Sequence, residues 1–280
     1  MPSSMDRVRS ERVEAVLELA FQRVPLAHKD LIDVFAREYF AQVDPEDLNA
    51  RSPQDLLGAM LSHWQFGSTR DQGDAKVRVL SPTVATTGWE SRHSVIDIVN
   101  DDMPFLVDTV TMEIDRQGLT LHLIVHPIVA VERDERGQLL AVQPRELLSA
   151  TVPQAPQAPR APLESWIHAE VDRLIEPQQR ADLVAGIERV LADVRVAVTD
   201  WKPMVGRLHE VIHELEHLPS SIAPEQGDET RAFVQWLADD HLTLLGYRQH
   251  DLVIDNGQDA LRSVPGIGLG LLREHDSQSL

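Results

Sequence analysis

The sequence has no cysteine among its 280 residues. It therefore cannot form disulfides, offer a thiolate nucleophile or bind zinc through cysteine. A chain without disulfides fits the cytosol, and we expect a cytoplasmic location. Long hydrophobic runs are also missing: a bilayer span needs roughly 18–20 apolar residues, and the best candidate, residues 119–131, is short and interrupted by His122, His126 and Pro127. The N-terminus mixes charges and has no continuous apolar core, so we do not expect it to be a secretory signal.

Positive charge is scarce as well. The chain has 26 lysine and arginine residues against 45 aspartate and glutamate residues, a formal net charge of −19 at pH 7. Such a chain repels phosphate groups, so we expect neither nucleic acid nor an anionic membrane surface among its partners. The hydrophobic content of 42% supports globular cores. The length allows two domains, or one domain with extensions.

The first 74 residues are predicted to be helical. Apolar residues recur at helical spacing through residues 10–66. Asp44 and Ser52 are good N-cap residues, and each precedes a proline at the first helical position, where the missing N–H costs nothing. A polar, glycine-containing stretch at residues 67–74 follows, so we expect a small helical domain over residues 1–74.

A strand–helix–strand unit is predicted over residues 94–131. Residues 94–99 form an apolar, β-branched run that is typical of a buried strand. Asp102 is a candidate N-cap, and Pro104 fits the first turn of the helix that follows. Gly118 is expected to end this helix. The chain then returns as one longer strand over residues 119–131.

Further strands are predicted around this unit. Residues 77–80 form a short apolar run before it. Residues 133–137 indicate a hairpin turn into a strand at residues 138–142. The side chains from Trp166 to Asp172 alternate between two faces, which suits a strand better than a helix.

Residues 149–162 are rich in proline, alanine and glutamine, and we interpret them as an extended insertion between two strands. Residues 178–218 are predicted to be helical with a break near residues 201–203. A helix over residues 229–239 and a strand over residues 242–254 follow. We expect residues 228–280 to be the start of a second α/β domain that is cut short.

Several segments together resemble one known family. The segment GWESRHSVIDIVNDDMPFLVD (residues 88–108) is the most specific of them. The others are ESWIHAEVDR, WLADDHLTLLGYRQHDL and PGIGLGLLR. They resemble the N-terminal region of the large bacterial NAD-dependent glutamate dehydrogenases, over most of the chain. In that family this region is similar to an ACT domain, a βαββαβ module that often binds amino acids as effectors.

The resemblance implies an α+β fold. It would consist of an N-terminal helical segment and an ACT-like (ferredoxin-like βαββαβ) domain over residues 75–220, with an antiparallel sheet and helices on one face. The family's catalytic domain would lie beyond residue 280. We therefore expect a regulatory and assembly region without catalytic residues or a cofactor of its own, with NAD bound elsewhere in the parent enzyme. Edge strands are natural contacts between copies, so we expect self-association in a homo-oligomer. The alternative is a free-standing ACT-like amino-acid sensor or adaptor.

The candidate site is the polar loop and the glycine that flank the central helix. Asn100, Asp101, Asp102, Pro104 and Gly118 are predicted to contact an amino-acid effector or a neighbouring subunit, since a strand–helix junction exposes amides to a carboxylate. The competing interpretation is that the two aspartates cap the helix. Two carboxylates in the loop would also repel an effector's own carboxylate.

Residues 209–213 (HEVIH) match the H-E-x-x-H pattern, in which two imidazoles on one helix face bind zinc and the glutamate polarises water. His217 lies one turn further along. The alternative is a solvated, charge-rich helix, because Glu210, Glu214 and Glu216 crowd the same run. We favour a connecting helix over a zinc hydrolase, and we predict no metal ligand.

Two further patterns are interpreted as structural. His122 and His126 share one strand face but lie about 13 Å apart at strand rise, too far to bind one metal ion. Residues 266–270 (GIGLG) lack the G-x-G-x-x-G spacing of a dinucleotide site, because position 271 is leucine.

Overall fold

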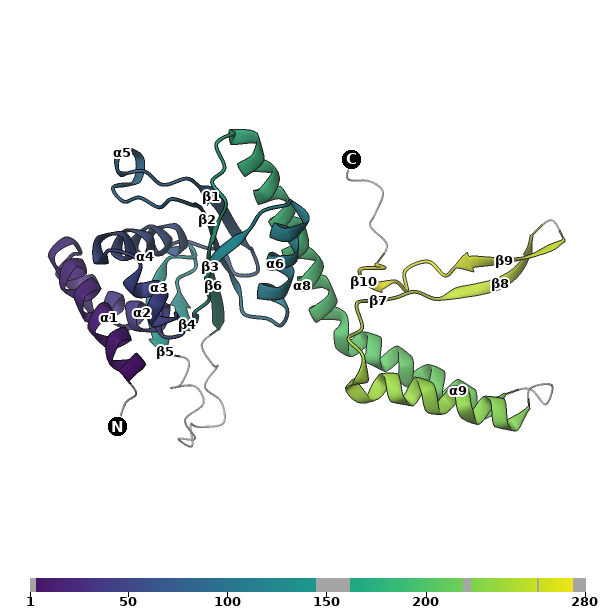
Figure 1. Ribbon diagram of the computed structural model, residues 1–280. Helices are drawn as coiled ribbons and strands as arrows, with labels where there is room; N and C mark the ends of the chain where they lie inside the picture. Colours follow the sequence, from purple (N-terminus) through teal and green to yellow (C-terminus); the bar gives the residue numbers. More distant parts are fainter. Residues whose placement is uncertain (1–3, 145–161, 219–222, 256, 274–280) are drawn as a thin grey trace, which may run out of the picture. The chain divides into compact units, whose positions relative to one another are not determined.

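The computed structural model describes residues 4–144, 162–218, 223–255 and 257–273 (Figure 1). The chain divides into two compact units, Met1–Leu191 and Ala192–Leu280. The long helix α8 (Pro177–Glu214) contributes residues to both. The predicted insertion at residues 149–162 lies, except for Pro162, outside the described residues.

Helices make up the N-terminal part of the first unit. They are α1 (Ser4–Arg23), the 3-10 turn η1 (Leu26–His28), α2 (Lys29–Phe40), α3 (Pro45–Asn49) and α4 (Pro53–Gly67). The Asp44 carboxylate accepts a hydrogen bond from the Glu46 amide at 2.8 Å. The Ser52 hydroxyl accepts one from the Asp55 amide at 3.1 Å. These side chains satisfy amides that a helix start leaves open, and they confirm both predicted helix starts.

A six-stranded antiparallel sheet forms the centre of the first unit. Its strands are β1 (Lys76–Leu80), β2 (Ser94–Asp101), β3 (Leu121–Val125), β4 (Ile128–Arg133), β5 (Leu139–Pro144) and β6 (Leu163–Val171). The order across the sheet is β1-β2-β6-β4-β5, and β3 also pairs with β6. A short helix, α5 (Val84–Thr87), lies between β1 and β2. The predicted hairpin is confirmed, since the Gly137 amide donates to the Asp134 carbonyl between β4 and β5.

Strand β6 is a central strand of the sheet, because both of its edges are paired with other strands. One edge pairs with β2, and the other pairs with β4 and then with β3. Between β3 and β4 the chain passes through Pro127, which has no N–H to donate. Its carbonyl accepts a hydrogen bond from the Trp166 amide at 3.0 Å. The predicted single strand over residues 119–131 is therefore wrong, and two shorter strands follow one another along the same edge of β6.

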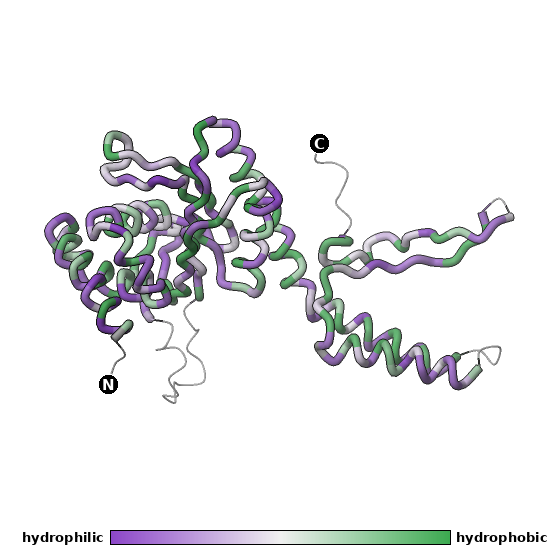
Figure 2. The backbone as a smooth tube through the Cα atoms, in the orientation of Figure 1, coloured by the Kyte–Doolittle hydropathy of each residue, from purple (hydrophilic) through white to green (hydrophobic). Residues whose placement is uncertain are grey.

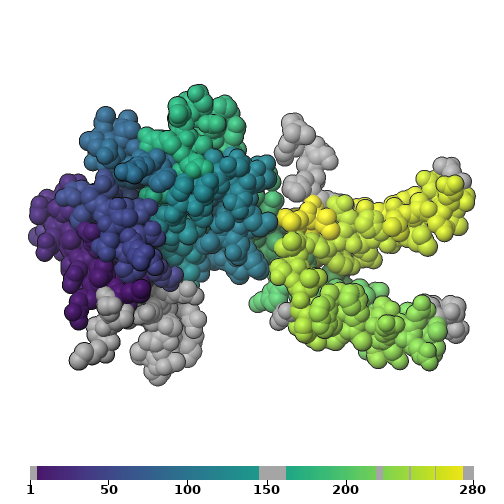
Figure 3. Space-filling view, viewed as in Figure 1, coloured from purple at the N-terminus to yellow at the C-terminus, as the bar shows by residue number. Residues whose placement is uncertain are grey.

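Helices cover both faces of this sheet (Figure 1). Helices α1–α4 lie on one face, and α6 (Leu106–Arg116) lies with the first part of α8 on the other. Figure 3 shows the purple and blue N-terminal helices packed directly against the teal part of the chain. The helices of the ACT-like unit, α6 and α8, lie on one face as predicted, and the N-terminal helices cover the other face.

The core between α1–α4 and the sheet centres on Trp166, which is fully buried. The rings of Phe35 and Trp64 lie around it, with centroids 4.9 and 6.3 Å from that of Trp166. Gly67, at the end of α4, approaches the Trp166 ring so closely that a Cβ at this position would overlap it. Figure 2 shows hydrophobic and hydrophilic stretches alternating along α1–α4, as expected of helices with one buried side.

Helix α6 begins later than predicted. Its N-cap is Phe105, whose φ of 72° lies in the left-handed region, and no side chain caps it. Pro104 therefore precedes the helix. Asp102 accepts a hydrogen bond from the Ser165 hydroxyl at 2.7 Å, so its predicted role as N-cap is wrong. Gly118 follows the last turn with a φ of 73° and confirms the predicted helix stop.

Glu113 of α6 joins this helix to α8. Its carboxylate accepts hydrogen bonds from Arg116 at 2.7 Å and from Gln117 at 2.9 Å. Arg189 of α8 donates to it at 3.2 Å. The hydrogen bond from Arg116 is the main cause that lowers the pKa of Glu113 from 4.5 to about 2.

The second unit contains the rest of α8, short helices and two pairs of strands. The helices are η2 (Leu215–His217), α9 (Pro224–Trp236) and the π-helical turn η3 (Leu237–His241). Strand β7 (Gly246–Tyr247) pairs with β10 (Leu269–Gly270), and β8 (His250–Asp255) pairs with β9 (Gln258–Ser263). Helix α8 continues through Pro203, so the predicted break near residues 201–203 is wrong. The predicted strand over residues 242–254 is also wrong, because β7 and β8 are separate.

The predicted α+β class with an antiparallel sheet is confirmed. In a βαββαβ unit the last strand follows the second helix, which here is α8. The edge strand β1 instead comes before the first strand–helix–strand unit in the chain. The predicted ranges 1–74, 75–220 and 228–280 do not coincide with the two compact units. Among the described residues we find no helix with the length and apolar content that a bilayer crossing requires.

Replacing Gly67 by alanine is expected to destabilise the protein by about 1–3 kcal/mol, because the added methyl group overlaps the buried Trp166 ring. Urea unfolding measures this change in the free energy of unfolding. The matched control is Gly206→Ala on α8, where a Cβ meets nothing within 4 Å and alanine favours a helix by about 0.5–1 kcal/mol. Equal effects of the two substitutions would contradict tight packing at Gly67.

The contact between α6 and α8 is expected to weaken in acid. Because the pKa of Glu113 is lowered in the folded state, its stabilising contribution is present above its unfolded pKa of about 4.5 and is lost as the pH falls toward 2. Glu113→Gln should remove about 1–2 kcal/mol of this pH dependence, measured from urea midpoints at about pH 6 and about pH 3. Glu135→Gln, at an exposed position in the β4–β5 turn, should leave it intact. A Glu113→Gln profile identical to that of the unaltered chain would refute this role.

Candidate functional site

The face of the sheet beneath α1–α4 carries buried charge. Glu164, His168 and Glu170 alternate along β6 with the same parity as Trp166, whose ring packs on α2. Asp97 of β2 pairs with His168 in the ladder. All four polar side chains belong to residues that are at most 4% exposed. Burying an ionised group is costly unless it is paired, so each needs a partner.

Glu164 is paired with two arginines. Its carboxylate accepts hydrogen bonds from Arg70 at 2.8 and 3.1 Å and from Arg133 at 2.7 and 2.8 Å. The Trp166 indole N–H donates to it at 3.2 Å, and Arg70 also donates to Asp101 at 2.6 Å. Burial alone would lower the pKa of Arg70, but the charge of Glu164 and the hydrogen bond to Asp101 raise it above its ordinary value.

A second cluster surrounds Asp97. His168 Nδ1 donates to Asp97 Oδ1 at 2.7 Å, and Arg78 donates to Oδ2 at 2.7 and 3.0 Å. His63 Nδ1 lies 3.7 Å from Asp97 Oδ1 and accepts from the Tyr39 hydroxyl at 3.2 Å. Burial lowers the pKa of His63 to about 4, so its ring is neutral near pH 7. Burial alone would raise the pKa of Asp97, but His63, His168 and Arg78 hold it well below its ordinary value.

A cavity of about 750 Å³ opens beside the Asp97 cluster. It is lined by residues of α2, α3 and α4, of the loop after α5 and of β3 and β6. Tyr39 and His168 are among them, as is Glu170. Arg51 donates to both oxygens of Glu170, at 2.5 and 3.4 Å. The volume lies in the range of small-molecule sites, and polar groups of several helices and strands converge on the cavity.

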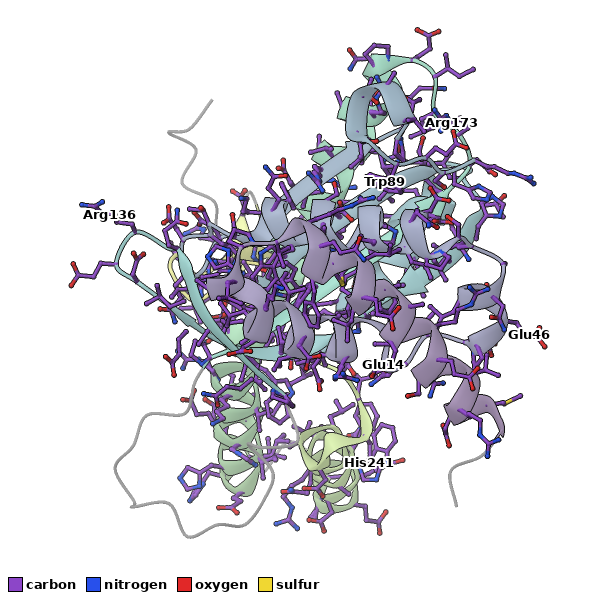
Figure 4. All side chains as sticks on the ribbon, turned by 90° about the vertical axis from the view of Figure 1, so that its left-hand side faces the viewer. Glu14, Glu46, Trp89, Arg136, Arg173 and His241 are labelled. Atoms are coloured by element: carbon purple, nitrogen blue, oxygen red, sulfur yellow. The ribbon has the colours of Figure 1, made fainter. Side chains whose placement is uncertain are left out.

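The loop at residues 89–93 forms one wall of the cavity and is held by hydrogen bonds. Arg173 donates to the carbonyl of Ser91 at 2.7 Å and to that of His93 at 3.4 Å. Figure 4 shows Trp89 and Arg173 on the same side of the molecule. The most family-specific segment of the sequence thus begins at the cavity wall, which hydrogen bonds from Arg173 hold in place.

Two imidazoles and an arginine lie at the rim. The rings of His93 and His122 stack with centroids 4.1 Å apart, and His122 Nε2 lies 2.8 Å from Asp172. Burial and the neighbouring His122 lower the pKa of His93, which favours a neutral ring. Arg92 is exposed, and no hydrogen bond or ion pair joins its guanidinium to another described residue. This arginine can therefore meet a ligand's carboxylate without losing a partner.

The five residues predicted for an effector loop or subunit contact do not form one site. Asn100, Asp101, Asp102 and Pro104 precede α6, whereas Gly118 follows its other end. Eleven helical residues separate the two groups, about 16 Å at helix rise. Asn100 is fully buried, and both aspartates accept hydrogen bonds from other side chains. Pro104 and Gly118 are exposed. Their proposed contacts stay a prediction.

The H-E-x-x-H segment lies at an exposed end of α8. Its glutamate, Glu210, accepts a hydrogen bond from Arg207 at 2.6 Å. The side chains here that are close enough to share an ion are His213, Glu216 and His217. His209, the first histidine of the motif, is not among them.

Residues 266–270 do not fit a dinucleotide. The Gly270 amide donates to Asp200 at 2.8 Å, and a Cβ at Gly268 would overlap the Leu272 carbonyl. These glycines therefore allow close approach to the chain itself.

Sequence reasoning missed the cavity and both buried clusters. Their cations, Arg51, Arg70 and Arg78, lie far from β6 in the chain, and no local spacing connects them with it. One signal was present: a strand with glutamate and histidine at alternate positions from Glu164 to Glu170. It predicted the strand but did not indicate that helices bury its polar face.

Comparisons with known proteins point to one family. A family model described as "Glutamate dehydrogenase, ACT1 domain" matches residues 35–187. The chain is 39% identical over 243 residues to a NAD-specific glutamate dehydrogenase of Halomonas elongata. This alignment covers 86% of the chain but 14% of that relative. The chain is 32% identical over 218 residues to the NAD-specific glutamate dehydrogenase of Pseudomonas aeruginosa, and this alignment covers 78% of the chain and 13% of that relative. The chain is 27% identical over 198 residues to the NAD-specific glutamate dehydrogenase of Mycobacterium tuberculosis, and this alignment covers 69% of the chain and 11% of that relative.

Replacing Glu164 by glutamine is expected to destabilise the first unit by about 3–5 kcal/mol, because it leaves two buried arginines without their shared carboxylate. Chemical unfolding followed by far-UV circular dichroism measures the change. Glu132→Gln is the control, because Glu132 is an exposed residue of neighbouring β4, and its effect should stay within about 0.5 kcal/mol. A Glu164→Gln variant as stable as this control would show that the cluster contributes little.

Proposed function

The chain belongs to the family of glutamate dehydrogenase ACT1 domains. We therefore propose that it is the N-terminal regulatory and assembly region of a large NAD-dependent glutamate dehydrogenase. The parent enzyme would convert L-glutamate, NAD⁺ and water to 2-oxoglutarate, ammonium and NADH. The proposal is supported by the name that the relatives share and by the small part of their length that the chain spans.

We assign no catalytic role to this region. Asp97 and His168 form a hydrogen-bonded pair like those that orient a general base. Arg78, however, also binds Asp97, and within the described part of the chain no hydroxyl group bonds to His168. The arrangement therefore favours binding over nucleophilic chemistry. In this proposal NAD binds the remainder of the parent enzyme, in the cytoplasm.

The cavity is a better effector site than the loop before α6. In the loop, Asp101 and Asp102 are engaged and would repel a carboxylate. The cavity instead combines Arg92 with acidic side chains, among them Glu90 and Glu170, of which Glu170 is already bound by Arg51. An amino acid carries one charge of each sign, so its carboxylate would bind Arg92 and its ammonium group an acidic side chain. The hydrogen bonds that hold the wall would lower the cost of ordering it around such a ligand.

The assembly role is proposed from the edges of the sheet. Strands β1 and β5 end the strand order, and an edge strand presents unpaired backbone groups to another chain. We therefore expect self-association of the parent enzyme to involve this region.

An amino-acid effector is expected to stabilise the 280-residue chain in a thermal-shift screen of the common amino acids. At about 100 times its dissociation constant it would contribute about 2.7 kcal/mol and raise Tm by about 5 °C. Arg92→Gln should abolish the shift. Arg136→Gln removes the same charge from an exposed turn far from Trp89 and Arg173 (Figure 4) and should keep it.

The same amino acid should change the rate of glutamate-dependent NADH formation by the whole enzyme that carries this chain. Absence of this activity in the whole enzyme would refute the parent assignment. A flat thermal response in an active enzyme would refute only the effector site.

A further inference from the structure

Donor atoms from two helices and two strands converge beneath the floor of the cavity. They are His63 Nδ1 from α4, Asp97 Oδ1 from β2, His168 Nδ1 from β6 and the Tyr39 hydroxyl from α2. The two imidazoles and the carboxylate offer ligand atoms that all lie within 4.8 Å of one another. The Tyr39 hydroxyl lies 3.2 Å from His63 Nδ1. All four residues are at most 2% exposed.

The distances suit a small divalent ion. Zinc binds imidazole nitrogen and carboxylate oxygen at about 2.0–2.2 Å, which in a tetrahedral site places the ligand atoms about 3.3 Å apart. Here His168 Nδ1 lies 2.7 Å from Asp97 Oδ1, and His63 Nδ1 lies 3.7 Å from the same oxygen. Shifts of a few tenths of an ångström in these two pairs would therefore give the Asp97 carboxylate and each imidazole the spacing that a shared ion requires.

The surrounding groups hold His63 and Asp97 in the orientation that a metal ion needs. His63 Nε2 lies 3.2 Å from the Ile98 carbonyl, which can only accept, so Nε2 carries the proton and Nδ1 keeps its lone pair. A ligating histidine usually donates its other N–H to such a carbonyl. Arg78 holds Asp97 Oδ2 and leaves Oδ1 directed at the two imidazoles. His168 needs only to move its proton from Nδ1 to Nε2.

We propose that His63, Asp97 and His168 bind a zinc ion, with the Tyr39 hydroxyl at the fourth position. Imidazole and carboxylate donors suit Zn²⁺, and the cavity gives it an entry path because Tyr39 and His168 line it. The ion would join two N-terminal helices to the two central strands. This role is structural, and it holds whether or not the chain regulates a dehydrogenase.

The competing arrangement is the hydrogen-bonded network alone, in which Tyr39 donates to His63 and His168 donates to Asp97. A competing place for metal is the exposed group His213, Glu216 and His217 on α8 and η2. The experiment must separate the buried site from both.

The test is zinc binding by the purified 280-residue chain after removal of metal with a chelator. We expect one equivalent of Zn²⁺ to bind and to raise Tm. His168→Gln should weaken binding by more than about 100-fold. The control with two substitutions, His213→Asn and His217→Asn, should bind as the unaltered chain does. Loading the unaltered chain with Co²⁺ should give the visible absorption of a tetrahedral site, a readout that does not depend on any variant folding.

The proposal is overturned if the unaltered chain binds no stoichiometric zinc. It is also overturned if the surface control alone abolishes binding, or if Co²⁺ shows only the weak absorption of an octahedral, water-exposed ion.

Discussion

The first unit depends on one electrostatic constraint: ionised side chains of the sheet face that helices cover must all be paired. Glu164 and Glu170 of β6 are buried, and so is Asp97 of β2. Their cations come from separate places, with Arg51 after α3, Arg70 after α4 and Arg78 on β1. A carboxylate buried before its arginine arrives is strongly destabilising. The N-terminal helices and the sheet therefore gain stability together, which explains why a segment with its own helical pattern belongs to the same unit.

The fold could be predicted from the sequence where structure is decided locally. The caps at Asp44 and Ser52 and the helix stop at Gly118 follow from short-range chemistry, and the structure confirms them. Predictions failed where a distant part of the chain decides. Pro127 divides a strand whose register is set by β6, and Asp102 binds Ser165 instead of its own helix. The cavity also depends on a distant part of the chain, because its wall is held by Arg173, which lies 82 residues beyond Ser91 in the sequence.

The proposed effector site and the buried charge share residues, which would give the proposed regulation a physical route. Glu170 and His168 line the cavity and also belong to the paired groups beneath the helices. A ligand at Arg92 and Glu170 would compete with Arg51 for the same carboxylate and so change how α3 rests on the sheet. Regulation requires a ligand to bind two states with different affinity. A contact that a ligand can exchange for one of its own supplies such a difference.

The alternation of charge along β6 also limits how the strand can be placed. Every second side chain from Glu164 to Glu170 lies on the sheet face that α1–α4 cover, and those between, such as Ile167 and Ala169, lie on the other face. Sliding the strand by one residue would exchange the two sets. The acids and the imidazole would then lie on the opposite face from Arg51, Arg70 and Arg78, and the aliphatic side chains would leave Arg51 and Arg70 uncompensated. The charges that make this sheet face expensive to bury thus act against misaligned pairing, at the strand that every other part of the sheet is built around.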